Sequence, residues 1–312
     1  MGGCLMNTNS FLISIVIPAF NEQNSLPELV ERIEKVMDNL GQEFEIILIN
    51  DGSTDTTELV IQRLKQEKNY IRSIKFHKNF GKAVALNEGF RSSSGDFVIT
   101  MDADLQDEPE EIPVLLDKII EGYDLVTGWK KDRQDPLEKR LPSKLFNYVT
   151  GIVAGLKIHD YNCGFKIYRK EVITELDLYG EMHRYVPALV YWKGFRVAEV
   201  AVRHSPRKFG KSKYGIKRYM RGLFDFMTVY FLIKYMSKPM HFFGALGFFS
   251  SLTGFAILLY LTAIWLTGER IGDRPLLILG VLLLFLGMQF ISTGLISELI
   301  IYLSKKNKSR LL

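Results

Sequence analysis

The stretch Asp96-Phe-Val-Ile-Thr-Met-Asp-Ala-Asp-Leu-Gln106 joins a short apolar run to two carboxylates at its end. The apolar run predicts a buried β-strand, and Asp102 and Asp104 follow where that strand ends. Side chains two positions apart on an extended chain point to the same side, so the two carboxylates can bind one cation together. Oxygen ligands suit Mg²⁺ or Mn²⁺, ions that usually also bind substrate phosphates. An acidic, solvated turn is the alternative that this stretch alone leaves open.

Similar apolar runs recur through the first 130 residues and alternate with helical patterns. Ser25-Leu-Pro-Glu28 predicts a capping box at the start of a helix that Gly41 closes, and further helices are expected around 82–91 and from Pro109. The predicted strands are 13–17, 44–49, 71–76, the run that ends at Asp102, and 124–128. Regular alternation of strand and helix predicts an α/β fold with a mostly parallel, doubly wound sheet.

Three polar clusters follow predicted strands, at 18–22, 51–55 and 102–106. Ligands of such sheets bind beyond the carboxyl ends of the strands, so we expect the clusters to converge. Glu22 and Asp51 can accept hydrogen bonds from a nucleoside, and Phe20 can stack on its base. For 51–55 a simple turn with a helix N-cap is the competing interpretation. The first strand lacks a following Gly-x-Gly-x-x-Gly and the chain lacks a P-loop, which excludes the usual dehydrogenase and nucleoside triphosphatase signatures.

Two uncharged apolar runs distinguish the C-terminal part of the chain. Residues 239–268 and 275–297 contain no Asp, Glu, Lys or Arg, and each exceeds the roughly 20 residues needed to cross a bilayer. They predict a transmembrane hairpin over 239–304, with spans of about 241–266 and 276–301. Basic residues flank its two outer ends and the connection 269–274 has no net charge, so the N-terminal domain and the basic tail 305–312 are expected in the cytoplasm, at the inner membrane. Glu298 in the second run is either functional or interfacial.

The remaining segments carry weaker signals. Residues 1–10 lack the pattern of a signal peptide and are expected to form a disordered leader. The two cysteines, Cys4 and Cys163, indicate no disulfide framework, and Cys163 is expected to be a small buried residue.

Between Arg203 and Arg221 stand eight basic residues and no acid. Because aromatic residues follow directly, 214–238 is predicted to form interfacial amphipathic helices, and nucleic acid is not expected as a partner.

Four motifs together resemble glycosyltransferase family 2, and more narrowly its dolichyl- and polyprenyl-phosphate glycosyltransferases. They are Ile17-Pro-Ala-Phe-Asn-Glu22, Asn50-Asp-Gly-Ser-Thr-Asp55, Asn79-Phe-Gly-Lys82 and Asp102-Ala-Asp-Leu-Gln106. The resemblance covers nearly the whole chain, including the paired apolar helices. It implies a GT-A-type catalytic domain over residues 11–213 and metal-dependent, inverting transfer of a hexose from a nucleotide-diphosphate sugar to a polyprenyl phosphate. A UDP-sugar is favoured over GDP-mannose, with Mg²⁺ or Mn²⁺ as cofactor, and self-association is left open.

The resemblance also implies roles for individual residues of this chain. Asp104 and Arg140 are implied as catalytic residues, and the metal ligands are Asp102, Asp104 and Gln106. The nucleotide-binding residues implied are Pro18, Phe20, Glu22, Asp51, Lys82, Asp102 and Ala103. Contacts to the acceptor phosphate or the diphosphate are implied for Lys130, Arg133, Lys139, Arg140, Ser143, Arg207 and Lys213. Position 130 is commonly Arg in the family, and Arg133 is a nearby substitute for its bidentate contact.

No general base is nominated. Some bacterial members carry an Asp where this chain has Cys163-Gly164. A polyprenyl phosphate is already anionic and can attack the anomeric carbon directly. Two other functions remain open: a processive polysaccharide synthase, whose Gln-x-x-Arg-Trp motif is missing here, and a non-catalytic membrane scaffold, which would not need the acidic pair. The identity of the sugar does not follow from the motifs.

Overall fold

The computed structural model describes residues 11–131, 147–148, 150–205, 230–231, 235 and 238–308. The expected leader 1–10 and most of the expected interfacial helices lie outside the described residues. The chain divides into two units, residues 1–226 and 227–312.

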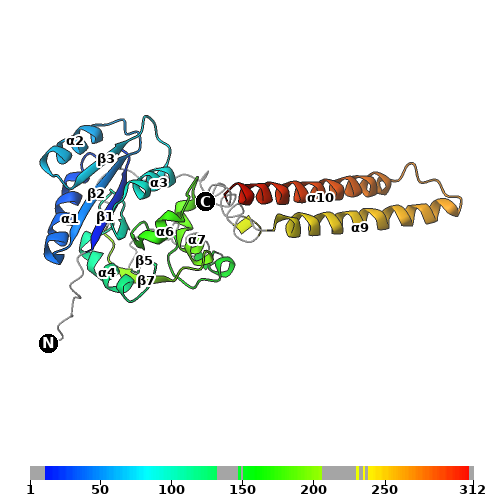
Figure 1. Ribbon diagram of the computed structural model, residues 1–312. Helices are drawn as coiled ribbons and strands as arrows, with labels where there is room; N and C mark the ends of the chain where they lie inside the picture. Colours follow the sequence, from blue (N-terminus) through cyan, green and yellow to red (C-terminus); the bar gives the residue numbers. More distant parts are fainter. Residues whose placement is uncertain are drawn as a thin grey trace. The chain divides into compact units, whose positions relative to one another are not determined.

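The first unit is built on a seven-stranded sheet in the order β3-β2-β1-β4-β6-β5-β7. Its strands are β1 Leu12–Ala19, β2 Glu43–Asn50, β3 Ile71–Lys75, β4 Phe97–Thr100, β5 Leu125–Lys130, β6 Lys166–Arg169 and β7 Val197–Val202. Neighbouring strands pair in parallel except at β6, which is antiparallel to both β4 and β5. The sheet is therefore mostly parallel, as the alternating pattern predicted (Figure 1).

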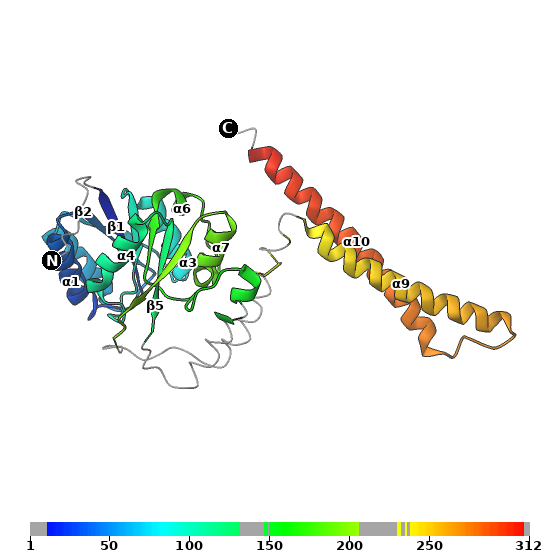
Figure 2. The same ribbon diagram turned by 90° about the horizontal axis from the view of Figure 1, so that it is seen from below.

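Helices cover both faces of this sheet, because alternate residues of the strands face opposite sides. Ile13, Ile15 and Ile17 pack into one core and Val16 into the other. The first core is closed by α1 Leu26–Leu40, α2 Thr57–Glu67 and α4 Ile112–Ile120, and the second by α3 Lys82–Ser92, α6 Lys170–Thr174 and α7 Val186–Trp192. Figure 2 shows α1 and α4 on one side of the strands and α3 and α7 on the other.

All five expected strands are present as β1 to β5, whereas β6 and β7 were not predicted. β6 has only four residues and begins and ends on a charged side chain, so it carries little of the apolar signal that marks a buried strand. Helix α1 ends at Gly41 in the left-handed conformation, as predicted. The capping box was wrong: the Ser25 hydroxyl makes no cap bond and instead donates to Glu22 Oε2 at 2.8 Å.

The second unit contains two helices long and apolar enough to cross a membrane, α9 Pro239–Leu266 and α10 Pro275–Lys308. They pack closely because glycines face each other: a Cβ on Gly247 would lie 2.7 Å from the carbonyl oxygen of Gly287, and one on Gly254 equally close to that of Gly280. Glu298 of α10 accepts the backbone N–H of Met240 at 3.3 Å, at the start of α9. That contact indicates a structural role for this carboxylate, because the first N–H groups of a helix lack intrahelical partners.

Candidate functional site

The ends of β1, β2 and β4 bring the three predicted polar clusters to one edge of the sheet. Ala19 pairs with Asn50 and Val16 pairs with Thr100, so the chain leaves β4 beside the last residues of β1. The N–H of Asp51 donates to Ala19 O at 2.9 Å, and that of Met101 to Val16 O at 3.2 Å. Asp51 and Asp102 therefore emerge on either side of the end of β1, at one edge of the sheet, as the convergence argument predicted.

The segment after β4 holds the acidic pair in a tight loop. Asp104 accepts the N–H of Gln106 on Oδ1 at 3.2 Å and is 8% exposed, whereas the side chain of Asp102 is 35% exposed. Leu105 adopts the left-handed conformation at φ 60°, which costs a non-glycine residue roughly 1–3 kcal/mol. Its side chain is fully buried in the core, and that burial offsets the cost. The loop is thus held in a shape that its own backbone disfavours, as is common at functional sites.

Lys82, the first residue of α3, forms an ion pair with Asp102 Oδ1. Burial alone would raise the pKa of the Asp102 carboxyl, but Lys82 and Lys130 hold this pKa well below its usual range. Burial would lower the pKa of Lys82, but the charge of Asp102 outweighs this effect. The pKa of Lys82 therefore lies above its usual value. Asp102 therefore stays ionised and Lys82 stays charged, so anion-binding and cation-binding groups lie side by side. Lys82 was predicted to lie near the nucleotide pocket, and the structure brings it to that edge.

Other residues expected to bind the nucleotide have structural partners. Asp51 accepts the N–H groups of Phe80 and Gly81 at 2.7 and 3.0 Å, and so fixes the turn before α3. Burial raises the pKa of Asp51 despite these two hydrogen bonds. The Glu22 carboxylate accepts the hydroxyl of Ser25, and the methyl group of Ala103 is buried in the core. Ala103 can therefore offer a ligand only its backbone groups.

Lys130 is the described member of the predicted phosphate-binding set, and its ammonium lies 2.7 Å from Asp107 Oδ1. The rest of that set lies outside the described residues: Arg133, Lys139, Arg140, Ser143, Arg207 and Lys213. His204 lies at the same edge, with its Nε2 3.4 Å from the amide nitrogen of Gln106.

Three contributors to the site were missed from the sequence: Gly164 and Lys166, which the antiparallel strand β6 places, and His183, which lies in the short helix Met182–Arg184. The first residue of β6, Lys166, pairs with Thr100 at the end of β4, so Gly164 lies against Asp102. A Cβ on Gly164 would come within 2.7 Å of Asp102 Oδ2. Lys166 is buried with its ammonium donating to Cys163 O, and His183 lies close enough to Lys82 and Asp102 to feel their charges. The sequence signal available was the polar turn before Lys166; Cys163 itself is buried, as predicted.

The donor set fits a hard divalent cation that completes its shell with substrate oxygens. Among the described residues no group of three or more His, Cys, Asp or Glu side chains could hold a metal ion. Asp102 and Asp104 nevertheless offer carboxylate oxygens, and Gln106 lies beside them. Mg²⁺ is commonly held by one or two carboxylates together with phosphates and water, so two acidic side chains are sufficient for such an ion.

We expect Lys166 to make the stability of the first unit depend on pH. Burial lowers the pKa of Lys166 to about 8. The unfolded chain, with a lysine pKa of about 10.4, binds this proton more tightly, so the free energy of unfolding should rise as pH increases from 8 to 10. We expect Lys166→Met to remove that rise, measured as the difference in melting temperature from the unmodified protein across this range. Exposed Lys157→Met is the control, and an equal pH response in all three proteins would contradict the assignment.

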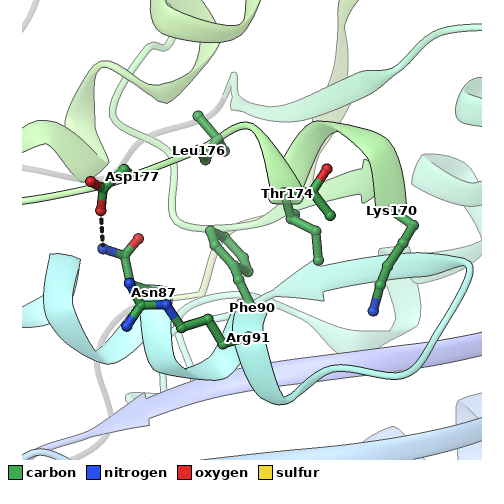
Figure 3. A pocket seen from close by; sticks show the side chains of 8 residues that line it. Asn87, Phe90, Arg91, Lys170, Thr174, Leu176 and Asp177 are labelled. Atoms are coloured by element: carbon green, nitrogen blue, oxygen red, sulfur yellow. Dashed lines mark hydrogen bonds between the residues drawn. The ribbon is translucent and has the colours of Figure 1, made fainter. Parts of the chain in front are cut away.

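A separate hollow of about 390 Å³ lies between α3 and α6 (Figure 3). β6 ends at Arg169, which pairs with Phe97 at the start of β4, and Lys170 follows there. The hollow is lined by Asn87, Phe90, Arg91, Lys170, Ile173, Thr174, Leu176 and Asp177. Asn87 bridges to Asp177 and to the backbone of Leu178. No residue predicted for the site lines this hollow, so it is distinct from the edge that carries the acidic pair.

Comparison with known proteins adds independent findings. The model of the family "Glycosyl transferase family 2" matches residues 14–177. The dodecaprenyl-phosphate galacturonate synthase of Rhizobium johnstonii is 40% identical over 297 residues, covering 93% of this chain and 88% of that protein.

Two structures of glucosyl-3-phosphoglycerate synthase from Mycobacterium tuberculosis share the fold. The complex with Mn²⁺ and UDP-glucose has a TM-score of 0.56 at 18% identity, covering 72% of this chain and 79% of that one. The complex with Mn²⁺, UDP and glucosyl-3-phosphoglycerate has a TM-score of 0.57 at 19% identity, covering 72% and 80%.

Proposed function

The chain belongs to glycosyltransferase family 2, and we propose that it transfers one hexose from a nucleotide-diphosphate sugar to a polyprenyl phosphate. The observation that carries the proposal is the Asp102–Asp104 pair at the ends of β1, β2 and β4, in a chain that continues into two apolar helices. The relative named above makes a polyprenyl-phosphate sugar, and its similarity extends over 93% of this chain.

The donor is expected to lie across the edge formed by β1, β2 and β4. We assign the nucleoside to the surroundings of Pro18, Phe20, Glu22 and Asp51, and the diphosphate to the neighbourhood of Lys82. A UDP-sugar is favoured over GDP-mannose, in keeping with the UDP-glucose bound by the structural neighbour. The sugar itself is to be identified by experiment, and a hexuronate belongs among the candidates because of the relative's product.

A divalent cation, Mg²⁺ or Mn²⁺, would be held by Asp102, Asp104 and Gln106, and when bound it would neutralise charge on the departing diphosphate. Lys82 contributes a second positive charge next to Asp102. The pKa of the Lys82 ammonium lies above its usual value, so this group remains protonated throughout the physiological range. Positive groups placed where negative charge develops in the transition state are a large source of catalysis.

The acceptor needs no side chain to activate it. An oxygen of the lipid phosphate forms a bond to the anomeric carbon while the bond from that carbon to the diphosphate oxygen breaks. The nucleoside diphosphate leaves with the electron pair, and attack from the opposite face inverts the anomeric configuration. We assign the lipid phosphate to the segment that contains Arg133, Lys139, Arg140 and Ser143, and to Arg207 and Lys213, with Arg140 and Asp104 as catalytic residues.

The two apolar helices would anchor the protein in the inner membrane, with its N-terminal domain in the cytoplasm. This orientation rests on the basic residues that flank the hairpin and on the neutral connection between its helices. It places the active edge in the compartment that supplies nucleotide sugars. Self-association is compatible with this arrangement and is to be tested.

The direct test is transfer by the purified full-length protein. Detergent-solubilised protein is incubated with undecaprenyl phosphate, Mn²⁺ and a panel of UDP- and GDP-sugars that includes hexoses and hexuronates, and the lipids are analysed by mass spectrometry. One lipid that gains a single sugar mass supports the proposal and names the donor. A ladder of longer products would indicate a processive enzyme, and a folded protein that forms no product with any donor would contradict transfer to this lipid.

A further inference from the structure

The buried carboxylate of Asp107 joins two parts of the site. It is 1% exposed, and its Oδ2 accepts the backbone N–H of Asp102 at 3.4 Å. Its Oδ1 lies 2.7 Å from the ammonium of Lys130. One carboxylate therefore connects the first residue of the acidic pair to the last residue of β5.

Lys130 presents little surface to a ligand. Its side chain is 9% exposed, and β5 is paired with β7 so that Lys130 lies opposite Val202. Burial would lower the pKa of Lys130, but Asp107 raises it well above the usual value, so Lys130 stays charged. Removing one member of a buried ion pair leaves the other charge uncompensated, which strongly destabilises the folded protein. The contact between Lys130 and Asp107 is therefore expected to persist in the folded state.

The loop that contains Asp107 is also attached to the end of β7. Asp107 forms an antiparallel bridge with His204, and the N–H of Ser205 donates to Gln106 O at 3.0 Å. The Ser205 hydroxyl donates to Glu108 Oε1 at 2.6 Å, and Arg203 donates to Glu111 Oε1 at the same distance. These contacts hold the loop on its side toward β7, and the pair with Lys130 holds it on its side toward β5.

We propose that Lys130 is a positioning residue that acts through Asp107 to hold Asp102 in place for the metal, and that it is not a direct contact of the acceptor phosphate. The proposal rests on the metal-dependent function proposed above. It differs from the role that the family resemblance implied for position 130, because the ammonium is already paired and covered. A positioning role predicts that loss of Lys130 impairs metal-dependent nucleotide binding even when no lipid is present.

The experiment measures binding rather than turnover. UDP and, separately, GDP are titrated calorimetrically into the full-length protein in detergent over a series of Mn²⁺ concentrations, well below the melting temperature and without lipid. Lys130→Met is expected to raise the Mn²⁺ concentration for half-maximal binding roughly 10- to 100-fold, as for other residues that support metal ligands. Lys130→Arg keeps the charge and should restore most of the affinity. The adjacent exposed Lys131→Met is the matched control and should bind like the unmodified protein.

Two further variants guard against misfolding. Asp107→Asn should resemble Lys130→Met, and the double variant, which leaves no unpaired buried charge, should be no worse than either single variant because the two residues act as a unit. Unchanged Mn²⁺ dependence in Lys130→Met with a raised KM for lipid phosphate would overturn the inference and restore the phosphate contact. A lowered melting temperature with unchanged Mn²⁺ dependence would overturn it as well. If the unmodified protein bound neither nucleotide at any Mn²⁺ concentration, the proposed function itself would fail, and this inference with it.

Discussion

Replacement of Asp102 by Asn is expected to lower the rate of sugar transfer by roughly 1,000-fold, the upper range for loss of one charge-stabilising group in an active site. The amide has the shape of the carboxylate but lacks its charge, so a divalent cation loses a strong ligand. The same change removes the counter-ion of Lys82, which then repels the metal without compensation. Initial rates with saturating Mn²⁺ and donor measure the effect, and the Mn²⁺ concentration for half-maximal rate should also increase.

Asp117→Asn is the matched control, because Asp117 is an exposed acid on α4. It should leave both the rate and the Mn²⁺ dependence unchanged. Both variants should elute as folded protein, since the Asp102 side chain is a third exposed and does not fill the core. An Asp102→Asn protein that retained more than a tenth of the original rate would show that this carboxylate is not a metal ligand.

Replacement of Gly164 by Ala is expected to reduce transfer by roughly 100-fold, the penalty typical of a 1 Å misplacement of a catalytic group. The added methyl would stand 2.7 Å from Oδ2 and 2.9 Å from Cγ of Asp102. Real Cβ atoms do not approach this closely, so the carboxylate has to move away from its position next to Lys82. The defect should appear in the Mn²⁺-dependent binding of the donor nucleotide as well as in the rate.

Gly151→Ala provides the control for this substitution. A Cβ there would make ordinary contacts, the nearest at 3.5 Å to Leu156 O, so both activity and stability should be preserved. If Gly164→Ala lowered the melting temperature but left Mn²⁺-dependent binding intact, the glycine would serve packing alone. Full activity in this variant would show that Asp102 can bind the metal from a shifted position.

The positions of the first five strands along the chain were readable from the sequence because each buried strand is a short apolar run between helical segments. The same pattern did not predict β6. Its four residues carry little apolar signal, and the strand is buried because it pairs with β4 on one side and β5 on the other. β7 was not predicted from the sequence either, whereas the apolar run of β1, which includes Ile13, was. Strand signals that depend on local apolar density are strong at the centre of a sheet and weak where polar residues interrupt it.

The site divides in the same way. The sequence predicted that Asp102, Asp104 and Asp51 lie at one edge because they follow strands whose parallel pairing brings their ends together, and the structure shows that pairing. The sequence alone also determined the two apolar helices, since their length and lack of charge suffice to predict them. The capping box at Ser25 was wrong, because the hydroxyl found a better acceptor in Glu22.

Only the tertiary structure decided which groups surround the acidic pair. The approach of Gly164 to Asp102 depends on the antiparallel course of β6, and the pairing of Lys130 with Asp107 depends on where β5 enters the sheet. Local periodicity predicts neither the order of the strands in the sheet nor the pairing of side chains between strands. Packing and charge in the folded chain decide which distant segments come into contact. The acidic motif and the apolar helices followed from local sequence, whereas the surroundings that tune the site followed from the fold.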